Sequence, residues 1–471
     1  MKYINREHPE YVARAAMWKK YRDLYAGGEE FRQNASDYLV RRSREPGEVY
    51  GERLNRVFYE NYVGSIVDWY GATLMRREPV IIAEGQNEPG KSFFREFTEN
   101  CDRKGTDLTE FFRQRLIEAM VYGSSWITVD FPRFRRKVAT RAEEDALGRS
   151  RAFLASYTPE EVINWSYDDQ GQLEWAVLRT SHLRQGKVTD ETWRNETRWL
   201  YYDRQNFRLY GRSGEEGSEI ELLDEGRHGL ANLGRIPLFQ LKVSGGLWLL
   251  NKAAALQLEH FNKSNALAWA LTMGLFAMPV VYSEREWNQM VGESYFIQLG
   301  PSDRFGWTEP EGHVFQIASD NLVRLKDEIY RVCYLMIQAW GSNSPQAQQS
   351  GWSKAQDLSV THEVLRAYGD AVKETMRQVL HAIEEARRDG LLIDVSGFDE
   401  FDIGDFGAEL ANAKALLEMG IESETLRRQV HKKVALKYLS DTRQALKSQI
   451  ADEIDAACEN RSNAAVEPEV S

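Results

Sequence analysis

Apolar residues recur at spacings of three and four in some stretches of the chain and at spacings of two in others, which predicts a mixture of helices and strands. Helical patterns occupy residues 10–25, 50–75 and 106–122. The apolar run at residues 124–131 indicates a buried strand, and residues 152–243 contain short alternating runs separated by glycines, which is typical of an antiparallel sheet. The pattern predicts an α+β first half.

Long helices dominate the pattern after residue 245. The first follows Gly245 and Gly246 and ends before Pro279. The second begins at Asp320 as its N-cap and ends at Gly341. Its apolar face consists of Leu322, Leu325, Ile329, Val332, Met336 and Ala339. The third runs from Lys354 to Asp389 and places Leu358, Leu365, Tyr368, Val372, Met376, Val379 and Ile383 in register.

The segments between and after these helices differ in composition. Residues 280–320 form a small mixed module between the first two long helices. Residues 341–353 contain no charged side chain and are rich in Gly, Pro and Ser, which predicts an exposed polar loop. Residues 406–458 indicate short helices, and residues 459–471 are expected to be a disordered tail.

Composition narrows the functional classes. The 471 residues carry a net charge of −12, which argues against a protein that coats itself in nucleic acid. Three cysteines, far apart in sequence, suggest neither a disulfide framework nor a zinc site. The apolar stretch at residues 266–282 is short for a membrane span and contains Pro279, and the N-terminus lacks the apolar core of a signal peptide. We expect no membrane association and no secretion.

A phosphate-loop pattern, GxxxxGK[ST], occurs at Gly85, Gly90, Lys91 and Ser92. Pro89 stands where a phosphate-binding loop needs an amide donor, and proline has none. The following sequence does not alternate strands with helices, as a nucleotide-binding sheet requires. We interpret the match as a surface turn formed by chance and expect no cofactor; a packaging ATPase that uses Lys91 stays as the alternative.

Other motifs are weaker. His362 and Glu363 lack the second histidine of a zinc protease helix, and the acidic run at residues 394–405 lacks the order of a calcium loop. Residues 416–434 imitate a DNA-reading helix-turn-helix, with cations at Arg427, Arg428, Lys432 and Lys433. An ordinary helical hairpin is the preferred interpretation because the chain is acidic. The sequence predicts neither an enzyme nor a metal site.

The order of these parts resembles the portal proteins of tailed bacteriophages. The resemblance covers most of the chain, and no single string within it is diagnostic. It is carried by residues 38–80 and 97–132, by "YTPEEVINW" at residues 157–165, and by "YFIQLGPSDRFGWTEPEG" at residues 295–312.

The resemblance implies a known arrangement of parts. In it, an α+β wing is followed by a helical stem, a small α/β clip, a loop into a central tunnel, and a helical crown. On this chain the wing is residues 1–245, the stem helices 246–277 and 319–340, and the clip 278–318. The tunnel loop is residues 341–353, the long helix with its return to the wing 354–405, the crown 406–458 and the tail 459–471.

The resemblance also implies a function: a ring, of 12 subunits in this family, at one capsid vertex, through which DNA is packaged, retained and ejected. The implied partners are further copies of the chain, double-stranded DNA without sequence specificity, the large terminase subunit, an adaptor protein at the clip and the major capsid protein. The ring would be assembled in the host cytoplasm and reside in the virion. A minor capsid or scaffold protein without a channel is a further alternative.

Candidate DNA-contacting residues follow from that mapping. The polar side chains of Gln346, Gln348, Gln349 and Ser350 can offer weak hydrogen bonds to phosphates without gripping them. Trp352 is expected to anchor the base of the loop. Lys354, with Lys326 and Arg331 on the second stem helix, is a candidate for transient contacts, although a salt-bridged surface role is as plausible for each.

Overall fold

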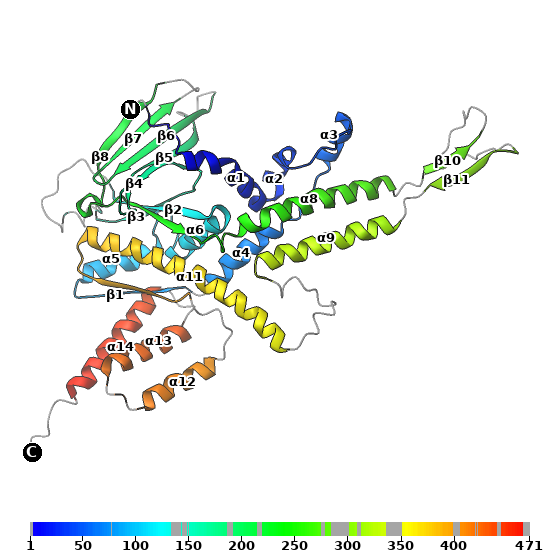
Figure 1. Ribbon diagram of the computed structural model, residues 1–471. Helices are drawn as coiled ribbons and strands as arrows, with labels where there is room; N and C mark the ends of the chain where they lie inside the picture. The colour runs from blue at the N-terminus through cyan, green and yellow to red at the C-terminus, as the bar shows by residue number, and fades with distance from the viewer. Residues whose placement is uncertain are drawn as a thin grey trace, which may run out of the picture. The chain divides into compact units, whose positions relative to one another are not determined.

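The computed structural model describes residues 3–76, 78–132, 150–185, 192–213, 219–274, 278–283, 301–308, 312–335, 351–398, 406–419, 423–439 and 444–464, with the single positions 143, 148 and 421. Figure 1 shows the mixture of helices and sheets, which confirms the α+β class. The chain divides into two compact units. Unit 1 contains residues 1–22, 66–251 and 351–471, and unit 2 contains residues 23–65 and 252–350.

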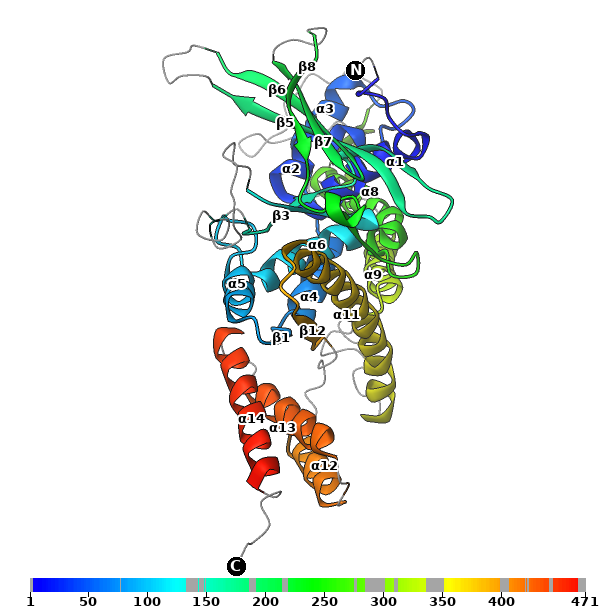
Figure 2. The ribbon, with the colours of Figure 1, turned by 90° about the vertical axis from the view of Figure 1, so that its left-hand side faces the viewer.

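Unit 1 contains a five-stranded antiparallel sheet in the order β4-β5-β6-β7-β8, which confirms the sheet predicted from the alternating pattern (Figure 2). Its strands are β4 (Val162–Tyr167), β5 (Leu173–Arg184), β6 (Arg194–Asp203), β7 (Asn206–Ser213) and β8 (Glu221–Arg227). Buried side chains from these strands, among them Leu178, Tyr202 and Phe207, form one apolar cluster with Trp126 and Leu238 of the neighbouring sheet. The sheet is therefore fixed by one shared core.

The neighbouring sheet has the order β3-β2-β9 and comprises β2 (Ser124–Asp130), β3 (Phe153–Tyr157) and β9 (Leu238–Lys242). Helix α1 (Pro9–Ala26) and helix α6 (Leu108–Tyr122) precede it in the chain. Helix α6 ends at Gly123, whose φ of 90° is readily adopted by glycine and places the backbone against the Trp248 ring. Trp248 donates a hydrogen bond to the Val121 carbonyl at 2.8 Å. This contact fixes the start of the helix that leads into unit 2.

A two-stranded antiparallel ribbon joins β1 (Val80–Glu84) to β12 (Leu392–Ser396). Helix α4 (Tyr62–Leu74) and helix α5 (Glu88–Glu99) flank β1 in sequence, and α11 (Gly351–Arg387) precedes β12. The predicted apolar face of α11 is confirmed: its members from residue 365 to residue 383 are buried, namely Leu365, Tyr368, Val372, Met376, Val379 and Ile383. The side chain of Leu358 lies outside the described residues.

The C-terminal part consists of helices α12 (Phe406–Glu418), α13 (Glu424–Tyr438) and α14 (Gln444–Ala464). Because α14 continues to Ala464, the prediction of a disordered tail from residue 459 was wrong for its first six positions. Residues 465–471 lie outside the described residues.

Unit 2 contains the short helices α2 (Gly28–Gln33), η1 (Ala35–Asp37) and α3 (Gly47–Asn55). Its two long helices are α8 (Leu249–Gly274) and α9 (Gly312–Val332). Between them in the chain, β10 (Met278–Tyr282) pairs with β11 (Arg304–Thr308) as an antiparallel hairpin (Figure 1). No helix within the described ranges is long and apolar enough to cross a membrane.

Three further predictions of helix bounds were wrong. Helix α9 begins at Gly312 rather than at Asp320, whose carboxylate accepts a hydrogen bond from the Gln316 side chain one turn earlier instead of capping the helix. Helix α9 also ends at Val332, before the predicted Gly341. The single helix predicted over residues 50–75 is two helices, because the Asn61 side chain accepts a hydrogen bond from the Gly64 amide at 2.8 Å and starts α4 there.

Candidate functional site

Helices α8 and α9 form an antiparallel pair in unit 2 (Figure 1). The Lys252 ammonium near the start of α8 donates to the Tyr334 hydroxyl, just past the end of α9, at 2.5 Å. Further along α8, Lys263 donates to Asn321 at 3.0 Å. These bridges connect increasing positions on α8 to decreasing positions on α9, so the two helices run in opposite directions.

The N-terminal segment of unit 2 is held on α8 by amide side chains. Gln257, which is fully buried, donates to the Glu60 carbonyl at 2.7 Å and accepts from the Val63 amide at 3.3 Å. Asn265 donates to the Phe58 carbonyl at 2.9 Å and accepts from the Phe58 amide at 3.1 Å.

Asn262 makes the same kind of contact with residues 38–40: it donates to the Tyr38 carbonyl at 3.1 Å and accepts from the Val40 amide at 2.8 Å. Each amide side chain thus donates to one backbone carbonyl and accepts from one backbone N–H of an irregular segment, as the backbone of a neighbouring strand would. Sequence analysis missed this role; its signal was the group of amide side chains at positions 257, 262 and 265 of α8.

Of the predicted stem cations, Arg331 is bound to its own helix. Its Nε donates to a Glu328 carboxylate oxygen at 2.7 Å and Nη2 reaches the other oxygen. This fork lowers the pKa of Glu328 and raises the pKa of Arg331. Lys326 lies 4.0 Å from Asp327 and is partly exposed. Both cations therefore have an acidic neighbour on α9.

A buried histidine lies close to Lys326. His260 on α8 packs edge-on against the Tyr62 ring, with ring centroids 5.0 Å apart, and its Nε2 is 3.7 Å from the Glu60 carboxylate. Burial lowers the pKa of His260, while the Glu60 carboxylate raises it and Lys326 lowers it further. The Tyr62 hydroxyl donates to the same carboxylate at 2.5 Å. These contacts join α4, α8 and the residues before α4.

Most of the predicted tunnel-loop residues, namely Gln346, Gln348, Gln349 and Ser350, lie outside the described residues. Helix α11 begins at Gly351, so Trp352 lies in its first turn rather than in a loop, and Lys354 follows on the same turn. The predicted end of the loop at residue 353 was therefore too late. The side chains of Trp352 and Lys354 are not among those described.

The phosphate-loop pattern falls on the turn between β1 and α5. The amide of Gly90 donates to the Asn87 side chain at 3.1 Å, which caps α5, and Lys91 is 3.2 Å from Glu88 one turn earlier. A Cβ at Gly85 would lie 2.7 Å from Leu391, and Gly90 likewise abuts Asp389 and Leu391. Strand β1 pairs antiparallel with β12. The two glycines thus serve close packing against residues 389–391. Ser92 follows within α5.

A buried ion pair lies beside this turn. Arg387 and Asp389 are 2.7 Å apart with side chains 3% and 1% exposed. The Arg387 guanidinium lies 3.8 Å from the Phe93 ring centroid, and Asn87 donates to the Asp389 carbonyl at 2.9 Å. The end of α11 is thereby tied to the start of α5.

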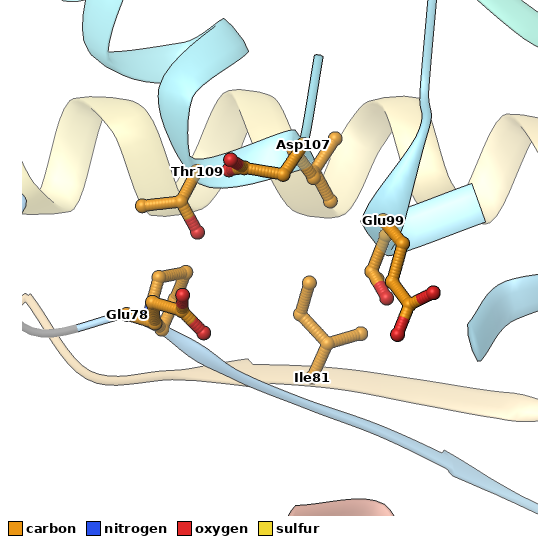
Figure 3. A pocket seen from close by; sticks show the side chains of 8 residues that line it. Glu78, Ile81, Glu99, Asp107 and Thr109 are labelled. Atoms are coloured by element: carbon orange, nitrogen blue, oxygen red, sulfur yellow. The ribbon is translucent and has the colours of Figure 1, made fainter. Parts of the chain in front are cut away.

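A cavity of about 330 Å³ lies at the other ends of β1 and α5 (Figure 3). The carboxylates of Glu78, Glu99 and Asp107 line it, together with Thr109 and Ile81. Asp107 accepts from the Glu110 amide and caps α6. A cavity with three carboxylates disfavours a nucleotide phosphate on electrostatic grounds.

Two cations of the helix-turn-helix-like segment form ion pairs with carboxylates of unit 1. The ammonium of Lys432, 3% exposed, lies 2.8 Å from Asp455 on α14 and 3.2 Å from Glu84 at the end of β1. Arg428 lies 3.6 Å from Asp455. These contacts fit the preferred interpretation of a helical hairpin; Gly420, its expected cap, lies outside the described residues.

Other chemistry-bearing residues give no further site. Glu363 forms an exposed ion pair with Arg366 on α11 at 2.8 Å. Across the part of the chain that the structure describes, no group of three or more His, Cys, Asp or Glu side chains could hold a metal ion. Cys101 and Cys333 are buried, and burial raises the pKa of each thiol, for Cys333 to about 12.

Comparison with known proteins gives one family model that matches part of the chain. Residues 250–381 match the model described as "Domain of unknown function (DUF4055)". None of the curated proteins matches the chain.

Among solved structures, a chain of "Neck of empty GTA particle computed with C6 symmetry" is 11% identical with a TM-score of 0.43, over 79% of this chain and 90% of that one. A chain of "Virion of native gene transfer agent (GTA) particle" is 12% identical with a TM-score of 0.40, over 84% of this chain and 97% of that one.

Proposed function

We propose that this chain is the subunit of a portal ring, a channel at a capsid vertex through which double-stranded DNA is packaged, retained and ejected. The observation that carries the proposal is the antiparallel pair of α8 and α9, with the hairpin β10–β11 between them in the chain and the long helix α11 after them. This is the stem, clip and long-helix order of the family that the sequence resembles. Such a subunit would be non-enzymatic and would reside in the virion.

Exposed apolar side chains on α9 support self-association. Val314 and Ile317, three residues apart on this helix, are 62% and 55% exposed in the single chain. Apolar residues at such a spacing share one helix face, and an uncovered apolar face marks a contact with a partner. In a ring the partner is the neighbouring copy, which would use the complementary face.

The surroundings of Lys326 and Arg331 on α9 support passage rather than tight binding of DNA. Phosphate contacts made by free cations add affinity and make it depend on salt. Arg331 already forms a bidentate ion pair with Glu328, and Lys326 lies beside Asp327. A phosphate that met this helix would compete with a carboxylate for each of these two cations.

Imaging the purified full-length chain tests the proposal. Negative-stain views down the axis and native mass spectrometry should show closed rings with an open centre. Ile317→Glu should reduce ring formation, whereas Leu392→Glu, which changes a more exposed apolar residue on β12 of unit 1, should leave rings intact. A chain that stays monomeric at micromolar concentration across a range of salt contradicts the proposal and favours a scaffold without a channel.

A packaging ATPase is the alternative from another class. It would need the Gly85–Ser92 turn to cradle phosphates, whereas the Gly90 amide is engaged by Asn87 and Lys91 by Glu88. Micromolar ATP binding that is abolished by Lys91→Ala would favour the ATPase over the portal subunit.

A further inference from the structure

Helix α9 ends where its sequence gives no reason to end. Its last helical residue is Val332, yet the sequence that follows, Leu335 to Trp340 ("LMIQAW"), contains neither glycine nor proline before Gly341. Leucine, methionine, glutamine and alanine are all favourable in helices. A helix that stops against its local preference is stopped by tertiary contacts.

The stop is made by a tyrosine in a conformation that favours glycine. Tyr334 has φ 63°, in the left-handed region. Its amide donates to the Arg331 carbonyl at 3.1 Å, and the Leu335 amide donates to the Tyr330 carbonyl at 2.9 Å. These two bonds are those of a Schellman helix end, in which glycine usually occupies the left-handed position. A side chain with a Cβ is unfavourable there.

Lys252 on the other long helix contacts this tyrosine. The Lys252 ammonium donates to the Tyr334 hydroxyl at 2.5 Å and lies 4.4 Å from the ring centroid. The neighbours Cys333 and Leu335 are buried, at 1% and 2% exposure, and so anchor the turn from both sides. All of these residues belong to unit 2.

We propose that the contact between Lys252 and Tyr334 is a latch that selects a short form of α9 over a longer one. With the latch made, the left-handed Tyr334 ends the helix. With the latch released, the strain at Tyr334 is relieved by a helical backbone, and α9 continues past Val332. A packed element with two alternative ends is suited to switching, because small changes at one contact decide between two discrete forms.

The consequence for DNA rests on the proposed function, since it concerns the segment that leads from α9 toward the predicted channel loop. A longer α9 would include residues that otherwise belong to that segment, and the segment would then have fewer residues with which to span its distance. Any force that slides α8 along α9 would separate Lys252 from Tyr334. The position of the two stem helices would thereby set the length of chain available to the loop.

Hydrogen exchange on the purified full-length chain tests the latch. Lys252→Met removes the cation but keeps a long side chain, and Tyr334→Ala removes the ring and favours a helix. In both variants the backbone amides at positions 334 and 335 should exchange about tenfold more slowly, because they move from a helix end to a helix interior. Lys252→Arg keeps a cation and should match the parent.

Tyr334→Gly is the matched control, because glycine adopts the left-handed conformation without strain and keeps the short end even without the latch. Exchange that is unchanged or faster in both Lys252→Met and Tyr334→Ala would overturn the inference, since loss of an ordinary stabilising contact gives that result. The measurement does not need a ring or DNA, so its outcome is independent of whether the portal proposal survives.

Discussion

The buried pair of Arg387 and Asp389 gives a quantitative test of what the phosphate-loop-like turn does. Asp389→Ala removes the carboxylate that lies 2.7 Å from the Arg387 guanidinium, whose side chain is only 3% exposed. Removing one partner of a buried ion pair costs about 3–5 kcal/mol, because the remaining charge stays buried and uncompensated. We expect a loss of stability of that size, and with it a looser turn between β1 and α5, since Asn87 also contacts the Asp389 side chain at 3.3 Å.

The chain provides a matched control for this substitution. Arg377 and Asp394 form an ion pair of the same length, 2.7 Å, with side chains 38% and 65% exposed. Exposed pairs contribute less than about 1 kcal/mol, so Asp394→Ala should hardly change stability. Urea unfolding followed by tryptophan fluorescence measures both variants against the parent. Equal losses in the two variants would refute the reasoning that burial, and not distance, sets the strength of these pairs.

Three further predictions follow from other parts of the chain. Lys91→Ala should change stability by less than about 1 kcal/mol, because its pair with Glu88 is exposed on one side, and isothermal calorimetry should detect no micromolar ATP binding in parent or variant. Burial lowers the pKa of His260 below its ordinary 6.5. The unfolded chain therefore takes up the proton first as the pH falls, and stability is lost below about pH 6.5; His260→Gln should flatten this dependence in urea titrations at several pH values. Deletion of residues 345–349 should leave rings intact in negative stain but reduce DNA retention in particles, and particles that hold full-length DNA would contradict the channel role of this segment.

The sequence predicted best those elements whose periodicity and burial agree. The apolar positions of α11 from Leu365 to Ile383 were identified correctly because a helix packed on one face must repeat them every three or four residues. The alternating runs of β4 to β8 identified the antiparallel sheet for the same reason at a period of two. In both regions the local sequence pattern and the tertiary packing favour the same secondary structure.

Prediction failed where a side-chain contact decided between two acceptable local structures. Asp320 has the chemistry of an N-cap, but Gln316 occupies its carboxylate within a helix that began at Gly312. Asn61 divided a continuous apolar pattern by capping α4. Tyr334 ended α9 without any glycine. None of these outcomes follows from propensity, because each depends on which partner the side chain meets.

The phosphate-loop pattern shows the same limit for function. Glycine is required at Gly85 and Gly90 because the loop after α11 approaches within 3.0 Å or less of where a Cβ would stand, and Lys91 follows on the first turn of α5 where it can meet Glu88. The pattern of a nucleotide site thus arose from two helix and strand ends packed together. Two observations argue against a nucleotide site, and neither can be read from the sequence. The Gly90 amide already has an acceptor, and β1 has an antiparallel partner.

The pair of Arg331 and Glu328 on α9 would let the proposed channel carry cations and still allow DNA to slide. In a ring of such subunits, every Arg331 would repeat around the axis with its Glu328, so each phosphate that gains a guanidinium also approaches a carboxylate. The net gain per contact is then small, and a moving duplex can exchange contacts between neighbouring subunits without a large barrier. Replacing Glu328 with Gln would free the guanidinium while leaving the helix unchanged. If the proposal is right, this variant should bind duplex DNA more tightly, with a steeper dependence on salt in fluorescence anisotropy; an unchanged affinity and salt dependence would mean that Arg331 does not meet DNA.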